Sequence, residues 1–156
     1  MIDRPAPAET DDILRLIERA GVFTATDVEC VRELLEDHFG RPDRTTYEFR
    51  VYRLDGRIAG MICYGPTPLT SGTFDLYWLA VGPEVRRRGV AQSLVADMEG
   101  EIRRRGARLL VVETSSSPEY QPAREFYLAS GFQRQATIPD FYLPGDDLVV
   151  YTKRFN

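Results

Sequence analysis

The sequence is poor in the residues that build metal centres and disulfide frameworks. Its 156 residues include two cysteines and one histidine. Cys30 and Cys63 form no Cys-x-x-Cys pair, so neither a disulfide framework nor a zinc site is predicted, and no metal is expected. The spacing favours two reduced core cysteines, with a reactive thiol as the weaker alternative. His38 lies near the end of a predicted helix, where interaction with the helix dipole is favoured over a catalytic role.

Long apolar runs and excess positive charge are also missing. No apolar segment approaches the ~20 residues that cross a bilayer, and the first residues lack the layout of a signal peptide. The formal net charge is −4, which argues against a general nucleic-acid-binding protein. We therefore expect a cytoplasmic protein that uses no nucleic acid and no membrane. The length predicts a single domain over residues 1–156.

The apolar pattern and the turn signals predict a mixed α/β chain. Helical spacing predicts four helices, over residues 11–20, 27–38, 93–106 and 121–130. Six strands are predicted, over residues 45–54, 57–64, 74–81, 108–114, 133–138 and 148–155, with a loop over 139–146. The order is ααβββαβαββ, and its two central β-α-β passes favour locally parallel pairing. The predicted fold class is therefore α/β, with a central mixed sheet and helices on both faces.

The loop Arg86-Arg87-Arg88-Gly89-Val90-Ala91 is the strongest sign of a binding site. It joins an apolar strand to a helix, and a helix N-terminus offers unpaired N–H groups and a positive dipole end to an anion. The loop matches neither Gly-x-x-x-x-Gly-Lys-Ser/Thr nor Gly-x-Gly-x-x-Gly. A solvated arginine cluster is the simpler alternative. Because adjacent like charges repel, however, a bound polyanion would relieve a real electrostatic cost.

Three ordered motifs resemble the GCN5-related N-acetyltransferase (GNAT) family. Arg86, Gly89 and Ala91 stand where that family has Gln/Arg-x-x-Gly-x-Gly/Ala, and residues 79–83 are similar to its Ala-Val-x-Pro strand end. Residues 123–132 match its Ala-x-x-x-Tyr-x-x-x-Gly-Phe signature. The motifs are most similar to the branch of ribosomal-protein alanine and N-terminal acetyltransferases. The resemblance covers roughly residues 50–155.

The resemblance implies acetyl-coenzyme A (acetyl-CoA) as co-substrate, bound where two central strands splay apart. Backbone groups of Leu79, Ala80 and Val81 would pair with the pantetheine arm. The N–H groups of the loop would hold the diphosphate, supplemented by charge-assisted bonds from the arginines. The implied cofactor-binding residues of this loop are Arg86, Arg87, Arg88, Gly89, Val90, Ala91 and Gln92.

Two residues are the candidate catalysts of direct acetyl transfer to an amine. Tyr127 stands where the family places its general acid; a core tyrosine is the alternative. Glu113 ends an apolar run, so we expect a buried carboxylate there. It resembles the proposed base of the alanine acetyltransferases. The alternative role is a strand-end carboxylate that pairs with an arginine or caps the next turn. Asp75 and a water molecule held by the backbone are the competing bases.

The acceptor side carries less sequence signal. Relatives usually place an asparagine after the fifth strand, whereas this chain has a longer serine-rich loop in which Ser117 or Gln121 could replace it. Phe141 and Tyr142 resemble an aromatic pair that lines the peptide slot of N-terminal acetyltransferases, flanked here by carboxylates suited to a cationic amine. Closing the core is the alternative for these aromatics. The expected partners are acetyl-CoA and a small-molecule or peptide amine, and a homodimer is left open. A non-catalytic acyl-CoA sensor is the competing function, which the presence of Tyr127 disfavours.

Overall fold

The computed structural model describes all residues, Met1–Asn156. Its strands are β1 (Ile2–Asp3), β2 (Glu48–Leu54), β3 (Arg57–Pro66), β4 (Thr73–Val81), β5 (Leu109–Ser115), β6 (Gln133–Leu143) and β7 (Asp146–Arg154). Its α-helices are α1 (Thr10–Ala20), α2 (Ala25–Gly40), α3 (Val90–Arg104) and α4 (Gln121–Ala129). Three short 3₁₀ turns are η1 (Pro7–Glu9), η2 (Pro83–Val85) and η3 (Pro118–Tyr120).

The seven strands form one mixed sheet in the order β1-β2-β3-β4-β5-β7-β6. The β4–β5 pair is parallel, whereas the β1–β2, β2–β3, β5–β7 and β6–β7 pairs are antiparallel. This arrangement confirms the predicted fold class. The chain divides into two compact units. The first comprises residues 1–65 and 78–101, and the second comprises residues 66–77 and 102–156.

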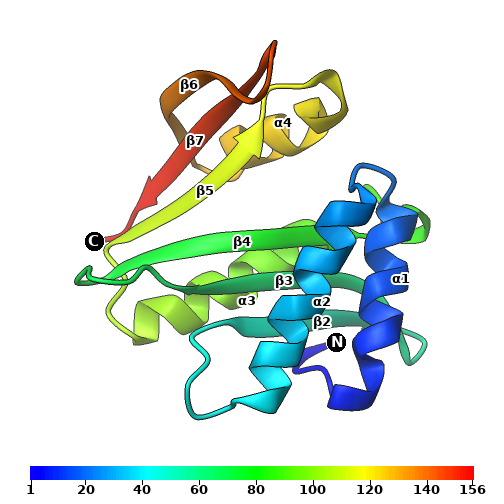
Figure 1. Cartoon of the computed structure of the whole chain (residues 1–156). Coiled ribbons are helices and arrows are strands. Elements are labelled where there is room, and N and C mark those ends of the chain that lie inside the picture. Colours follow the sequence, from blue (N-terminus) through cyan, green and yellow to red (C-terminus); the bar gives the residue numbers. More distant parts are fainter. The chain divides into compact units, whose positions relative to one another are not determined.

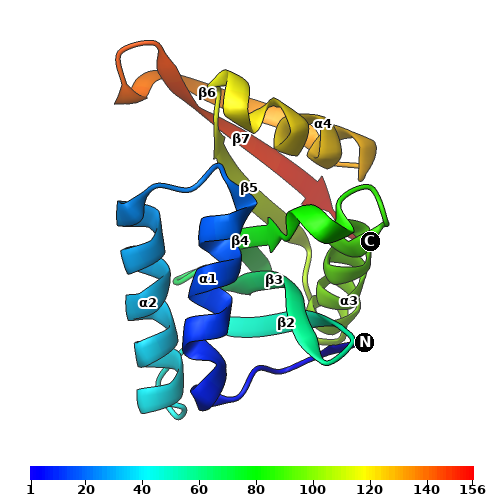
Figure 2. The same cartoon turned by 90° about the vertical axis from the view of Figure 1, so that its right-hand side faces the viewer.

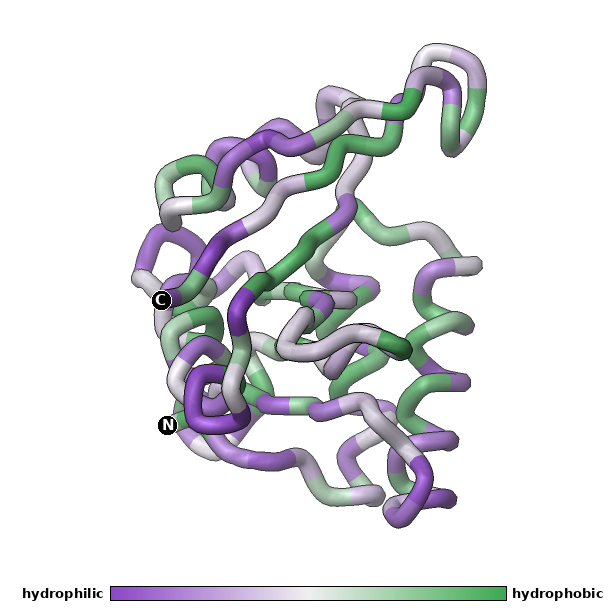
Figure 3. Tube along the Cα trace, turned by 90° about the vertical axis from the view of Figure 1, so that its left-hand side faces the viewer, coloured by the Kyte–Doolittle hydropathy of each residue, from purple (hydrophilic) through white to green (hydrophobic).

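In the first unit, helices cover both faces of the β2–β3 hairpin. Helices α1 and α2 lie side by side on one face and α3 lies on the other (Figures 1 and 2). The predicted apolar side of α1 is buried, and Gly21 ends this helix in the left-handed conformation, with φ of 84°. In Figure 3 the helical turns at the right of the trace alternate between green and purple, as expected for helices with one apolar side.

A tight turn joins β2 to β3, and a glycine on β3 lets α3 pack closely on this strand. Asp55 and Gly56 have φ of 49° and 76°, as in the two-residue hairpin turn that the sequence predicts. On the next strand, a Cβ atom at Gly60 would lie 3.0 Å from Val90 and 3.1 Å from Leu94. Glycine at this position therefore lets the first turns of α3 pack directly on β3.

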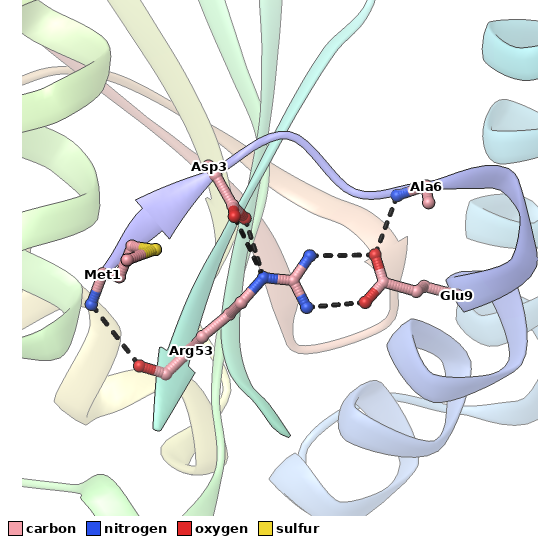
Figure 4. Close-up of polar contacts among 5 residues, drawn as sticks. All are labelled: Met1, Asp3, Ala6, Glu9 and Arg53. Atoms are coloured by element: carbon pink, nitrogen blue, oxygen red, sulfur yellow. Dashed lines mark hydrogen bonds and ion pairs between the residues drawn. The ribbon is translucent and has the colours of Figure 1, made fainter. Parts of the chain in front are cut away.

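A polar network attaches the chain start to the β2 strand (Figure 4). The Arg53 guanidinium donates to Asp3 at 2.9 and 3.2 Å and to Glu9 at 2.6 and 2.9 Å. Glu9 also accepts a hydrogen bond from the Ala6 N–H group at 2.8 Å. The network holds β1 and the start of α1 to the edge of the sheet in this unit. The sequence did not predict β1.

In the second unit, α4 packs against the β6–β7 hairpin. The Tyr127 ring lies 5.5 Å from the Phe132 ring and 6.0 Å from the Tyr151 ring, centroid to centroid. The hairpin is longer than predicted, because β6 continues to Leu143 and β7 begins at Asp146. The predicted loop over residues 139–146 is therefore wrong. Its proline and Gly-Asp-Asp turn signals belong to a long hairpin.

None of the α-helices is both long enough and apolar enough to cross a membrane.

Candidate functional site

The arginine loop follows β4 and the short η2 turn in the first unit. Val85 at one end and Val90 at the other are 1% and 3% exposed, so both ends of the loop are anchored in the core. Between them, Arg87 and Gly89 adopt positive φ of 61° and 76°, which turns the chain sharply into α3.

Helix α3 begins at Val90, three residues earlier than predicted. The Ser93 N–H group of the helix donates to the carbonyl of Gly89, the residue just before the helix, at 2.9 Å. The N–H groups of Val90, Ala91 and Gln92 thus belong to the first turn, where no carbonyl within the helix can accept them. Such a turn, directly after a left-handed glycine, is an anion-binding arrangement.

The three loop arginines are not equivalent. Arg87 and Arg88 are exposed, and their side chains form no hydrogen bond or ion pair. The Arg86 guanidinium instead donates to the carbonyl of Ala20, the last residue of α1, at 2.5 Å. Arg86 thus differs from Arg87 and Arg88, because its guanidinium binds the carbonyl at the end of a helix.

Leu79, Ala80 and Val81 form the last part of β4 in the first unit. Ala80 is buried, whereas Leu79 and Val81 are half-buried. The parallel ladder between β4 and β5 runs from Thr73 and Leu109 to Leu76 and Val112, and these three residues lie beyond its end. The Gly82 N–H group donates to the Ala59 carbonyl at 2.8 Å, which holds the strand end to β3.

In the second unit, two carboxylates share one face of the sheet. Asp75 on β4 pairs with Val111 on β5, and Glu113 follows Val111 by two residues. Asp75 accepts hydrogen bonds from the Thr67 hydroxyl at 2.6 Å and the Tyr77 hydroxyl at 3.4 Å. Glu113 is exposed and forms no hydrogen bond or ion pair, so the expectation of a buried Glu113 is wrong. Its side chain alternates outward while Val112 and Thr114 point inward.

Tyr127 lies on the other face of the β5–β7 ladder. Its ring contacts Tyr151, and Tyr151 pairs with Val112, whereas Glu113 pairs with Val150. Tyr127 is 6% exposed, and this burial raises the pKa of its hydroxyl well above the ordinary value of 10. Tyr127 therefore stays protonated throughout the physiological pH range, as a proton donor must.

The β6–β7 hairpin is tied to the loop that follows β5. The Asp147 N–H group donates to the Ser116 hydroxyl at 2.8 Å, and the Ser116 N–H group donates to the Asp147 carbonyl at 3.0 Å. Ser115 donates its hydroxyl proton to Asp146. Arg124 of α4 donates to the carbonyls of Ser115 and Ser117, at 2.7 and 2.8 Å.

Hydrogen bonds within the hairpin also involve the carboxylates of the predicted acceptor side. The Asp147 carboxylate accepts the Asp140 N–H group at 2.9 Å, and Asp140 accepts the Gly145 N–H group at 2.8 Å. The carboxylates of Asp140 and Asp147 thus accept backbone hydrogen bonds that hold the hairpin in shape. Phe141 and Tyr142 are 52% and 47% exposed, which excludes the alternative of a core role.

Ser117 and Gln121 are the two candidates for the missing asparagine contact. They differ in whether the side chain already has a hydrogen-bond partner. The Gln121 side chain donates to Glu125 at 3.0 Å, whereas the Ser117 hydroxyl has no partner. Arg124 and Asp147 were not predicted from the sequence as parts of the site. Their only signal was position, since Arg124 lies one turn before Tyr127 and Asp147 follows a Gly-Asp pair.

Comparisons with known proteins identify the class to which this fold and loop belong. The model of the acetyltransferase (GNAT) family matches residues 11–132. A crystal structure of a GNAT-family acetyltransferase from Desulfovibrio desulfuricans is 36% identical, with a TM-score of 0.95 over 99% of this chain and 98% of that one. The chain therefore belongs to the GNAT acetyltransferase family. It is an acetyl-CoA-dependent acetyltransferase.

More distant relatives agree with this assignment. An uncharacterized N-acetyltransferase of Methanocaldococcus jannaschii is 25% identical over 143 residues, which cover 85% of this chain and 88% of that protein. The ribosomal-protein-alanine N-acetyltransferase of Brucella melitensis shares the fold at 18% identity, with a TM-score of 0.77 over 99% of each chain. The PaiA N-acetyltransferase of Thermoplasma acidophilum, solved in complex with coenzyme A, shares it at 13% identity, with a TM-score of 0.76 over 99% and 98%.

Proposed function

We propose that this enzyme transfers the acetyl group of acetyl-CoA directly to a primary amine, in a ternary complex of enzyme, acetyl-CoA and acceptor. The observation that carries the proposal is the left-handed Gly89 followed at once by the free N–H groups of Val90, Ala91 and Gln92. These groups would bind the diphosphate, with Arg87 and Arg88 adding charge-assisted bonds. The backbone of Leu79, Ala80 and Val81 would hold the pantetheine arm.

The two candidate catalysts would act on different groups, Tyr127 on the leaving thiolate and Glu113 on the attacking amine. The amine nitrogen attacks the thioester carbonyl, and the carbon–sulfur bond then breaks and releases a thiolate. Tyr127 would donate its proton to that thiolate. Glu113 would accept the amine proton, directly or through a water molecule. We favour it over Asp75, because two hydroxyl groups already donate to the Asp75 carboxylate.

The cysteines support direct transfer over an acetyl-cysteine intermediate. Cys63 is 0% exposed, and its burial raises the pKa of its thiol well above the ordinary value of 9.0. Cys30 is exposed, so the expectation of a core position is wrong for this residue. Local desolvation and the nearby charges of Glu33 and Asp27 nevertheless raise the pKa of its thiol. Because the thiolate is the nucleophilic form, neither cysteine is activated for acyl transfer.

The acceptor would be a small-molecule amine or the N-terminus of a peptide, received near Glu113 and the exposed Phe141 and Tyr142. Half-exposed aromatic rings next to a sheet edge suit a flat or extended partner. The fold alone does not choose between these acceptors.

The test is a transfer assay with acetyl-CoA and a panel of spermidine, an aminoglycoside and an alanine-initiated peptide, read by mass spectrometry. We expect one acceptor class to gain one acetyl group per coenzyme A released, with no acetylated enzyme in the intact-mass spectrum. A protein that binds acetyl-CoA but acetylates no amine in the panel or in a cell lysate would contradict the proposal. An acetylated enzyme that forms without acceptor would contradict direct transfer.

A further inference from the structure

Arg86 links the arginine loop to a helix far away in the sequence. Its Nη2 atom donates to the Ala20 carbonyl across 66 positions of sequence. Ala20 is the last residue of α1, so its carbonyl is one of the four that a helix leaves without an internal partner. A cation is also favoured at this negative end of the helix dipole. The contact therefore satisfies the carbonyl of a buried residue, which would otherwise lose a hydrogen bond on folding.

A second contact joins the same two segments but contributes less. Arg19, in the last turn of α1, forms an ion pair with Glu84 of η2 at 3.3 Å. Their side chains are 45% and 47% exposed, so solvent screens this pair. Arg86 is thus the main polar tie between the loop and α1.

The end of α1 sets the path of the next segment, residues 21–24, which we call the connector. Gly21 turns the chain with φ of 84°, and Thr24 then caps α2 by accepting the Asp27 N–H group at 3.2 Å. Between these fixed ends, the Phe23 ring lies edge-on to the Trp78 ring, 5.7 Å away between centroids. Trp78 directly precedes Leu79, the first residue of the proposed pantetheine-binding stretch.

We propose that Arg86 is a positioning residue that holds the connector against Trp78, and that it is not a ligand of the diphosphate. The proposal rests on the proposed function, which gives the loop its cofactor. Moving the guanidinium to a diphosphate would leave the Ala20 carbonyl without its donor. Arg87 and Arg88, whose side chains have no partner, can bind the anion at no such cost. Arg86 thus shapes the protein wall beside the reactive end of the cofactor.

Trp78 is the only tryptophan of the chain, so its fluorescence reports on the connector without a ligand. The test compares acrylamide quenching of ligand-free wild type, R86M, R86K and R88M, together with coenzyme A affinity by titration calorimetry. R88M is the matched control, because it removes the same charge from the same loop without removing a side-chain contact. We expect R86M to roughly double the quenching constant, since the indole loses an ordered neighbour. R86K keeps one donor for Ala20 and should stay near wild type.

The affinity for coenzyme A should show the opposite pattern, with the larger change in R88M. R88M is expected to weaken its binding roughly tenfold through the lost charge-assisted bond, and R86M less than twofold. Unchanged quenching in R86M, or a loss of coenzyme A affinity in R86M equal to that in R88M, would overturn the proposal. If R86M does not fold, R86K decides: an affinity loss equal to that of R88M contradicts the positioning role. If wild type fails to bind coenzyme A, the proposed function fails, while the quenching comparison still tests the tie itself.

Discussion

Replacing Arg53 by methionine should destabilise the protein measurably and change its response to acid. The Arg53 side chain is 19% exposed and binds two carboxylates, Asp3 and Glu9 (Figure 4). The hydrogen bonds from Arg53, with a contribution from the Ala6 N–H group, lower the pKa of Glu9 from 4.5 to about 2. Methionine keeps most of the side-chain volume but removes every donor.

The size of the effect follows from that pKa. A change from 4.5 to about 2 corresponds to roughly 3 kcal/mol at 1.36 kcal/mol per pH unit. Because the Glu9 side chain is 23% exposed, solvent screening reduces the expected loss to about 1–2 kcal/mol. Since folding lowers the pKa, this stability is present above about pH 4.5 and is lost as the pH falls toward 2.

Urea unfolding followed by circular dichroism, from pH 7 down to pH 3, is the assay. R53M should lose about 1–2 kcal/mol of unfolding free energy at pH 7 and depend less on pH below 4.5 than wild type. R4M is the matched control, because Arg4 forms only an exposed 3.8 Å ion pair with Glu48 and should cost under about 0.5 kcal/mol. An R53M loss no larger than that of R4M, or an unchanged acid response, would refute this reasoning.

Three further predictions concern the site. Tyr127→Phe should lower turnover about 10²- to 10⁴-fold while sparing coenzyme A affinity, and unchanged turnover would remove Tyr127 from the mechanism. Glu113→Gln should lower turnover at least tenfold and alter the pH–rate profile, whereas the exposed control Glu119→Gln should do neither. An unaltered pH–rate profile in Glu113→Gln would argue for another base. Asp147→Ala should cost about 1 kcal/mol of unfolding free energy and raise the KM of the accepted amine, while Asp147→Asn keeps an acceptor for the Asp140 N–H group and should restore both. Equal effects of the two Asp147 variants would contradict this positioning.

The elements with local signals could be predicted from the sequence. Apolar spacing predicted α1 and α2, and Asp55-Gly56 predicted the hairpin turn, because these features depend on neighbouring residues alone. Two boundaries could not be predicted in this way. The predicted helix began at Ser93, but α3 begins at Val90 because that side chain is buried against β3. Pro139 suggested a loop, yet an edge strand tolerates proline.

The same distinction between local signals and distant contacts applies to the site residues. The loop glycine and Tyr127 belong to local motifs, so the sequence identified them as candidates. The exposure of Glu113 and the attachment of Arg86 to Ala20 depend on contacts between distant segments, which no spacing reveals. Asp147 acts through Ser116, a loop residue 31 positions away, and was missed for the same reason.

The most direct test of the central claim is a calorimetric titration of acetyl-CoA against Gly89→Ala and Gly56→Ala. Both glycines have φ of 76° with no Cβ clash, so the two variants bear the same backbone strain of about 1–2 kcal/mol. Only Gly89 lies in the loop that should hold the diphosphate. We expect Gly89→Ala to weaken acetyl-CoA binding at least tenfold, whereas Gly56→Ala should bind acetyl-CoA like wild type. Equal affinities in the two variants would contradict this expectation.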